Sequence, residues 1–160
     1  MGKLDKAADL TSNLKTERPY SQAGLYLGTS AFTAEGWQGS FYPQGTQPRE
    51  YLTHYAKTFR TVEVDSTFYA TPSASTVTGW YEKTPPDFFF AAKVPQIITH
   101  EKVLLDCDAE FDESIARMDD LLDEKLAPLL FQFPYFSRSQ FQAVNDLFRP
   151  LPTGRLSKSL

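Results

Sequence analysis

The fold is decided by residues 61–95, which read TVEVDSTFYATPSASTVTGWYEKTPPDFFFAAKVP. Two runs rich in β-branched and aromatic residues, 61–68 and 88–94, flank a segment in which Val77, Trp80 and Tyr81 share one face of a helix. A strand, a helix and a second strand in this order predict a βα unit with parallel strands. We therefore expect an α/β fold.

The same alternation extends to both sides of this unit. Apolar runs at residues 25–30 and 128–133 bring the predicted strands to four. Helical periodicity follows the four runs at about residues 48–59, 73–83, 111–126 and 139–148. The third helix has the clearest signal, because its apolar residues repeat at spacings of three or four: Phe111, Ile115, Met118, Leu122 and Leu126.

The two ends of the chain lack this alternation. Residues 1–24 have no apolar period and are expected to form a mobile leader, and residues 151–160 form a polar tail without a fifth strand. A closed (β/α)₈ barrel needs eight strands and about 250 residues. The sequence therefore predicts a partial TIM barrel, a half barrel of about four βα units over residues 25–150, truncated at the tail.

Composition argues against several classes of protein. The 160 residues carry a formal charge of −4, and their lysines and arginines are scattered, which gives no argument for DNA or RNA binding, although a local basic pocket would permit it. Cys107 is the only cysteine, so a reducing cytoplasm is the expected location. No stretch approaches the roughly 20 apolar residues of a transmembrane helix. We expect a soluble protein without a membrane partner.

Four motifs stand in order along the chain. They are LGTS at 27–30 with Trp37, Gly39 and FYP at 41–43; TVEVDSTFY at 61–69 with Pro72; FAAKVP at 90–95 with ITH at 98–100; and LLFQFP at 129–134. Together they resemble the motifs of the YecE-like family, known as domain of unknown function 72. The resemblance implies a TIM barrel, but it names a fold rather than a reaction. Asp65 departs from the asparagine usual in the family pattern.

Strand alternation predicts a catalytic group at one end of the sheet. If Val62 and Val64 face the helices, Glu63 and Asp65 point into the barrel, and Lys93 does so from the next strand. Barrel enzymes place catalysis at this C-terminal mouth. Glu63, beside Asp65, is the predicted general acid or base, Lys93 would hold a negatively charged substrate oxygen, and His100 would shuttle protons.

A second set of residues is predicted to bind the substrate. Thr29 and Ser30 would offer backbone N–H groups to an anion, and Gln132 would orient a polar group. Trp37 and Tyr69 would form an aromatic wall for a ligand ring, unless these rings only pack the loops together.

Alternatives remain open at this point. Glu63 and Lys93 would otherwise form a buried ion pair that fixes the strand register. Metal binding by Glu63, Asp65 and His100 is a minority interpretation, so no metal or cofactor is predicted. The leading function for full-length relatives is acid/base catalysis, as a hydrolase, lyase or isomerase, on a small polar or anionic substrate. The rivals are a barrel that binds a ligand or nucleic acid without turnover and an inactive truncated product. A half barrel is also expected to self-associate.

Overall fold

The computed structural model describes residues 21–22 and 24–135. Most of the predicted leader, the fourth predicted helix at 139–148 and the polar tail lie outside these residues. Within the described residues, no helix is long and apolar enough to cross a membrane.

A parallel sheet with helices packed on it forms the centre of the described structure. Its strands are β3 (Thr61–Val64), β4 (Phe89–Lys93) and β5 (Leu126–Leu130), in the order β3-β4-β5. Glu63 lies opposite Ala91, and Lys93 lies opposite Leu130. The predicted mixed α/β fold is confirmed, and β5 begins two residues earlier than the predicted strand at 128–133.

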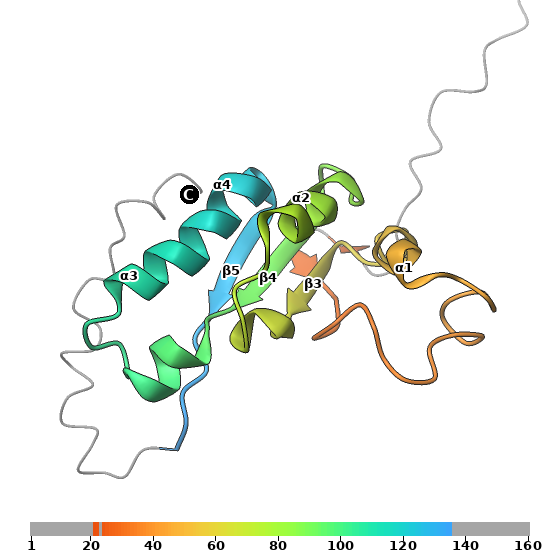
Figure 1. Cartoon of the computed structure of the whole chain (residues 1–160). Helices are drawn as coiled ribbons and strands as arrows, with labels where there is room; N and C mark the ends of the chain where they lie inside the picture. Colours follow the sequence, from red (N-terminus) through yellow and green to blue (C-terminus); the bar gives the residue numbers. More distant parts are fainter. Residues whose placement is uncertain (1–20, 23, 136–160) are drawn as a thin grey trace, which may run out of the picture.

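Helices cover one face of this sheet (Figure 1). They are α2 (Ala74–Glu82) and a continuous helix made of α3 (Asp108–Phe111), a π-helical turn η3 (Asp112–Ala116) and α4 (Arg117–Leu122), while α1 (Pro48–Tyr55) lies on the β3 side. Burying the apolar faces of these helices against the sheet supplies the main stabilising free energy. The buried core includes Leu52, Tyr55, Val62, Val64, Val77, Trp80, Phe88, Phe90, Ile98, Phe111, Ile115, Met118 and Leu122.

The helix predicted at 111–126 is shorter than its apolar period suggests. It ends at Leu122, because Asp123 adopts a left-handed φ of 46° that a helix cannot continue. A 3₁₀ turn η4 (Asp123–Lys125) follows, and Leu126 is the first residue of β5, so its place in the predicted helix was wrong.

The buried ammonium of Lys125 holds this turn in place. Its Nζ donates to the carbonyl oxygens of Tyr81 at 2.7 Å and Thr84 at 2.8 Å, near the C-terminal end of α2. It also lies 4.0 Å from the centre of the Tyr81 ring. These contacts satisfy acceptors that the end of a helix leaves unpaired, and burial lowers the pKa of Lys125.

The first predicted strand, 25–30, does not join the parallel sheet as a regular strand. Only β2 (Leu25–Tyr26) is a strand, and it pairs antiparallel with β1 (Ser21–Gln22), at the end of the predicted leader. Residues 27–30 run beside β3, where the Glu63 amide donates to the Thr29 carbonyl at 2.9 Å. The segment is thus attached to the sheet by local contacts in place of a full ladder.

The second predicted strand, 61–68, is also shorter than expected. It ends at Val64, and residues Asp65–Phe68 form a 3₁₀ turn, η1. The buried hydroxyl of Thr67 lies 2.7 Å from the carbonyl oxygens of both Val64 and Lys93, so it ties this turn to the ends of β3 and β4. A short π-helical turn, η2 (Ile97–Glu101), follows β4.

Candidate functional site

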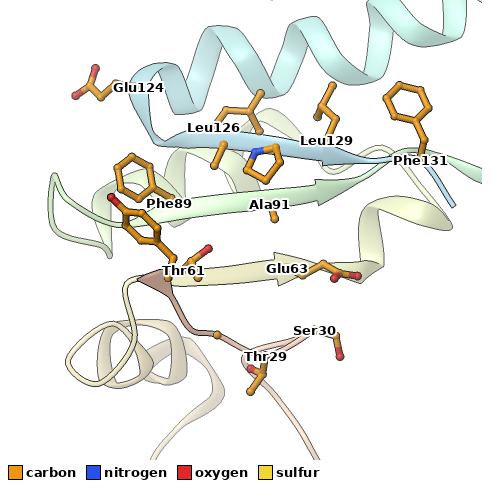
Figure 2. Close-up of a pocket in the computed structure, with 14 residues that line it drawn as sticks. Thr29, Ser30, Thr61, Glu63, Phe89, Ala91, Glu124, Leu126, Leu129 and Phe131 are labelled. Carbon is orange, nitrogen blue, oxygen red and sulfur yellow. The ribbon is translucent and has the colours of Figure 1, made fainter. Parts of the chain in front are cut away.

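The face of the sheet opposite the helices carries a cavity of about 980 Å³. Figure 2 shows its lining side chains, which come from the segment before β3 and from all three parallel strands. Most of the lining is apolar, and its polar or ionisable members include three Ser and Thr hydroxyl side chains and two glutamates. The lining residues are Tyr26, Gly28, Thr29, Ser30, Thr61, Glu63, Phe89, Ala91, Glu124, Leu126, Ala127, Pro128, Leu129 and Phe131.

Glu63 is the carboxylate at the C-terminal end of β3 in this cavity (Figure 2). Its neighbours Val62 and Val64 are buried on the helix side, whereas Glu63 is half-buried on the open side, as strand alternation predicts. Thr29 and Ser30 line the same end of the cavity from the preceding segment. The three residues bring two hydroxyl groups and one carboxylate together.

The phenol of Tyr55 sets the position of Thr29. The hydroxyl of this fully buried side chain accepts from the Thr29 amide at 2.9 Å, lies 3.0 Å from Thr29 Oγ1 and donates to the Thr61 carbonyl at 3.1 Å. One hydroxyl thereby bridges the segment and β3. Burial raises the pKa of Tyr55, while its hydrogen bonds with Thr29 act in the opposite direction.

Gly28 permits this close approach. A Cβ atom at its position would lie 2.2 Å from the Thr61 carbonyl oxygen, well inside van der Waals contact. The lack of space for a side chain therefore explains why glycine is required at this position. A left-handed backbone conformation is not the reason, since the φ of Gly28 lies outside that region.

Lys93 and His100 lie in a second group, centred on the ring of Phe68. Lys93 Nζ is 4.5 Å from the ring centre, and the His100 ring is 5.1 Å away in an edge-to-face arrangement. The hydroxyl of Thr99 lies 2.9 Å from His100 Nδ1. The exposed ring of Tyr69 contacts Phe68 from the next position, at 5.1 Å.

The remaining predicted residues do not line the cavity. Asp65 is half-buried at the start of η1, so its predicted place within the strand was wrong, because β3 ends at Val64. Gln132 is exposed beyond the end of β5. Trp37 packs against Phe41 at 5.4 Å and Tyr42 at 6.0 Å, the loop-packing alternative to an aromatic wall.

The ion pair and the metal site that the sequence left open both concern residues that the structure describes. Glu63 and Lys93 occupy the open side of neighbouring strands, but no ion pair within 4.0 Å joins them there. Across those same residues, no group of three or more His, Cys, Asp or Glu side chains gathers as metal ligands do.

Tyr55 and Phe68 are the positioning residues that the sequence did not reveal. Tyr55 belongs to the apolar face of α1, where its ring explains its burial and nothing in the periodicity indicates a role for its hydroxyl. Phe68 is the last residue of the predicted strand 61–68, and nothing in that motif indicates that its ring would lie beside Lys93 and His100. A polar atom on an otherwise apolar helix face is the signal that would have found Tyr55.

These features define the class of the protein as an α/β protein with a parallel sheet whose open face carries a cavity with a carboxylate at its C-terminal end. The sequence pattern of the family described as "Protein of unknown function DUF72" matches residues 26–157, and the chain belongs to this family. The family resemblance drawn from the four motifs is therefore confirmed.

Individual relatives agree with this assignment. The chain is 40% identical over 70 residues to the UPF0759 protein YecE of Escherichia coli (strain K12), covering 44% of this chain and 26% of that protein. It is 34% identical over 115 residues to the UPF0759 protein YunF of Bacillus subtilis (strain 168), covering 69% of this chain and 40% of that protein. The chain thus spans less than half the length of these curated relatives.

Solved structures of the same family are similar in fold. A DUF72 family protein from Thermotoga maritima matches with a TM-score of 0.64 and 33% identity, covering 79% of this chain and 52% of that chain. A DUF72 family protein from Enterococcus faecalis matches with a TM-score of 0.54 and 25% identity, covering 79% of this chain and 48% of the other. The matched region is about half of each solved chain.

Proposed function

We propose that the described unit is the first part of a (β/α)₈ barrel whose site lies at the C-terminal ends of its strands. The parallel order β3-β4-β5, with helices on one face, supports this proposal because barrels are built from such repeated units. The segment at residues 27–30 takes the place of a first strand beside β3. A match to about half of two solved family members is consistent with half of such a fold.

The proposed activity is acid/base catalysis on a small polar or anionic substrate, with Glu63 as the general acid or base. The observation that carries it is the position of Glu63, half-buried in the cavity beside the hydroxyl-bearing residues Thr29 and Ser30. A carboxylate exchanges a proton with a bound substrate when it lies within hydrogen-bond reach of it. The exposed Ser30 hydroxyl would orient a polar substrate in that position, because the Thr29 hydroxyl already donates to the Ala31 carbonyl and contacts the Tyr55 hydroxyl.

Binding without turnover is the second candidate, and the apolar character of the cavity favours it. Apart from Glu63, Glu124 and three hydroxyl-bearing Ser and Thr side chains, the lining consists of aromatic, aliphatic, proline and glycine residues. Ligand pockets are commonly of this kind, with a few polar groups that fix orientation. Such a barrel would hold a ligand with an apolar body and use Glu63 only as a hydrogen-bond acceptor.

Exchange of Glu63 for glutamine distinguishes these two functions. Glu63→Gln keeps the shape and polarity of the side chain but removes proton exchange near neutral pH. A mixture of small polar and anionic metabolites is incubated with this chain and with a full-length relative, and each reaction is followed by mass spectrometry. Glu82→Gln, at an exposed glutamate at the end of α2 that does not line the cavity, is the matched control.

Acid/base catalysis predicts that Glu63→Gln abolishes any turnover detected, while its thermal midpoint stays near wild type and the Glu82→Gln control keeps wild-type turnover. Turnover that survives in Glu63→Gln would assign Glu63 to ligand binding or to structure. Ligand-induced stabilisation without any product would support the binding function instead.

We further propose that a second copy of the chain is its partner and covers the open side of the sheet. Large apolar side chains are exposed in the described residues at the edges of that sheet, and β5 is the last strand of the described sheet. They are Leu25, Tyr26, Leu27 and Leu130. Size-exclusion chromatography with light scattering tests this: a concentration-dependent dimer is expected, and a sharp monomer peak at all micromolar concentrations would refute it.

A cytoplasmic location is part of the same proposal. Cys107 is buried and forms no disulfide, which suits a reducing compartment.

A further inference from the structure

The group around Phe68 is built by the ends of two neighbouring strands. Phe68 is the last residue of η1, and the hydroxyl of Thr67 fixes this turn against the carbonyl oxygens of Val64 and Lys93. The ring of Phe68 is therefore held beside the Lys93 side chain, whose Nζ lies 4.5 Å from the ring centre. The position of Phe68 follows from backbone contacts and not from its own packing alone.

The Lys93 ammonium has no counter-ion among the residues that the structure describes. Its side chain is half-buried on the open side of β4, and its recorded contact is with the ring of Phe68. An aromatic ring compensates a cation only partly for lost hydration. Because hydration of this half-buried ammonium is replaced only partly, it favours the binding of an anion from the open side of the sheet.

His100 supplies a second donor against the same ring. Thr99 Oγ1 lies 2.9 Å from its Nδ1, and Phe68 packs on its imidazole at 5.1 Å, so two contacts fix the ring orientation. The Thr99 hydroxyl also lies 3.4 Å from the Pro95 carbonyl oxygen; in the tautomer in which this hydroxyl donates to the nearer Nδ1, Nε2 carries the proton. Nε2 has no recorded partner within the described ranges and is left to donate to a ligand.

Glu63 and Lys93 lie at different places on the open side of the sheet, so one can act on the reacting centre while the other binds an anion. Glu63 lies opposite Ala91, and Lys93 is two residues further along the same face of β4. Because the two side chains form no ion pair, the ammonium remains available to an external anion although a carboxylate is a diagonal neighbour. Asp65, at the start of η1, and Glu101, after His100, add further negative charge near this end of the sheet and would limit the affinity for free anions.

We propose that Lys93 and His100, oriented by Phe68, form an oxyanion-binding subsite that takes a carboxylate or phosphate group. This inference rests on the proposed function in one respect: it assigns the bound oxyanion to the substrate of the Glu63 cavity. The substrate class is then an anionic molecule whose charged group lies at Lys93 and whose reacting centre lies at Glu63. His100 is a ligand donor in this assignment, in place of the proton shuttle expected from the sequence.

The two histidines of the chain provide a direct measurement. His100 lies in the subsite, and His54 packs elsewhere, on Phe41 at 5.7 Å and Tyr42 at 5.4 Å. Inorganic phosphate, and acetate in a separate series, are titrated into the 160-residue chain at constant pH and constant ionic strength while the ring proton signals of both histidines are followed by NMR. A saturable shift of the His100 signal with an unchanged His54 signal is expected for at least one of the two anions. The anion that produces it identifies the oxyanion as phosphate or carboxylate.

Variants locate the effect. Lys93→Met should weaken the apparent affinity by about tenfold or more, because a charge-assisted hydrogen bond is lost. Lys93→Arg, which keeps the charge, should retain binding, and Lys57→Met, at an exposed lysine of the α1 side, should bind as wild type does. Phe68→Leu removes the ring but keeps an apolar side chain, and it should weaken binding without loss of the His54 signal, which reports a folded chain.

The results separate this inference from the proposed function. Anion binding that persists in Glu63→Gln supports the subsite whether or not turnover is lost in that variant. The subsite is overturned if neither anion shifts the His100 signal, or if folded Lys93→Met binds as tightly as wild type. A shift of both histidine signals to the same extent would also overturn it, because it would report a general effect of the added salt.

Discussion

Replacing Tyr55 with phenylalanine removes one hydroxyl that three other groups use. The ring stays buried in the core, but the Thr29 amide loses its acceptor at 2.9 Å and the Thr61 carbonyl loses its donor at 3.1 Å. Thr29 Oγ1 loses a neighbour at 3.0 Å as well. The link between residues 27–30 and β3 then depends mainly on the bond from the Glu63 amide to the Thr29 carbonyl.

The expected loss of unfolding free energy is about 2 kcal/mol. Each hydrogen bond contributes roughly 1 kcal/mol net, and a backbone group left without a partner in a buried place costs about 1–3 kcal/mol. Thr29 is only half-buried, so water replaces part of what its amide loses. A loss of this size lowers the thermal midpoint by about 4–8 °C in a chain of this length.

Thermal and urea unfolding, followed by circular dichroism, measure this loss. Tyr51→Phe is the matched control: its ring stacks on Tyr42 at 4.3 Å, and its hydroxyl has no recorded hydrogen bond with the described residues. Amide hydrogen exchange at Thr29 and Glu63 should become faster in Tyr55→Phe and stay unchanged in the control. The reasoning is refuted if Tyr55→Phe loses less than about 0.5 kcal/mol, or no more than Tyr51→Phe, since a bridging hydroxyl contributes more than that.

Three further predictions concern the packing at Gly28, the buried ammonium of Lys125 and the pH dependence of stability. Gly28→Ala should lose more than about 2 kcal/mol in urea unfolding, because its Cβ would lie 2.2 Å from the Thr61 carbonyl oxygen. Gly79→Ala, which has open space inside α2, should instead gain about 0.5–1 kcal/mol, and equal effects of the two changes would contradict the packing argument. Lys125→Met should lose about 2–3 kcal/mol, because the Thr84 carbonyl loses its donor and the Tyr81 carbonyl keeps only the longer contacts from Thr84. The exposed control Lys83→Met should stay within about 0.5 kcal/mol of wild type, and a similar value for Lys125→Met would show that water replaces the ammonium. The unfolding free energy should fall as pH rises above about 10. In the unfolded state Tyr55 loses its proton there, whereas burial raises the pKa of its hydroxyl in the folded state. The unfolded state therefore binds fewer protons than the folded state, and a rise in pH favours it. Tyr55→Phe should flatten this alkaline slope in a series of urea unfolding curves, and an unchanged slope would assign it to other groups.

The sequence predicted the parts of the fold that depend on local pattern. The helix expected at about residues 73–83 is α2, with Ser73 as its N-cap, because apolar spacing and a capping side chain act over a few neighbouring residues. The strand expected at 88–94 is β4, within one residue at each end. Alternation also placed Val62 and Glu63 on opposite faces of β3, since this depends only on the two-residue period of a strand.

Element ends were predicted less well, because they depend on contacts between residues far apart in the chain. The strand at 61–68 is cut short at Val64 by a turn that Thr67 anchors to the carbonyl of Lys93, 26 residues away. Likewise, Lys125 reaches carbonyl groups at the end of α2, more than 40 residues earlier, and fixes where β5 begins. No local pattern contains these partners.

For the candidate site, the sequence by itself determined which residue types are available and which face of a strand carries them. Glu63 and Lys93 could be placed on the open side of neighbouring strands from alternation alone. Only the tertiary structure decided that Thr29 and Ser30 join Glu63 in one cavity, while Lys93 and His100 gather around Phe68. The physical reason is that strand periodicity fixes direction, whereas distance between side chains is set by packing and by hydrogen bonds across the fold, such as those of the Tyr55 hydroxyl.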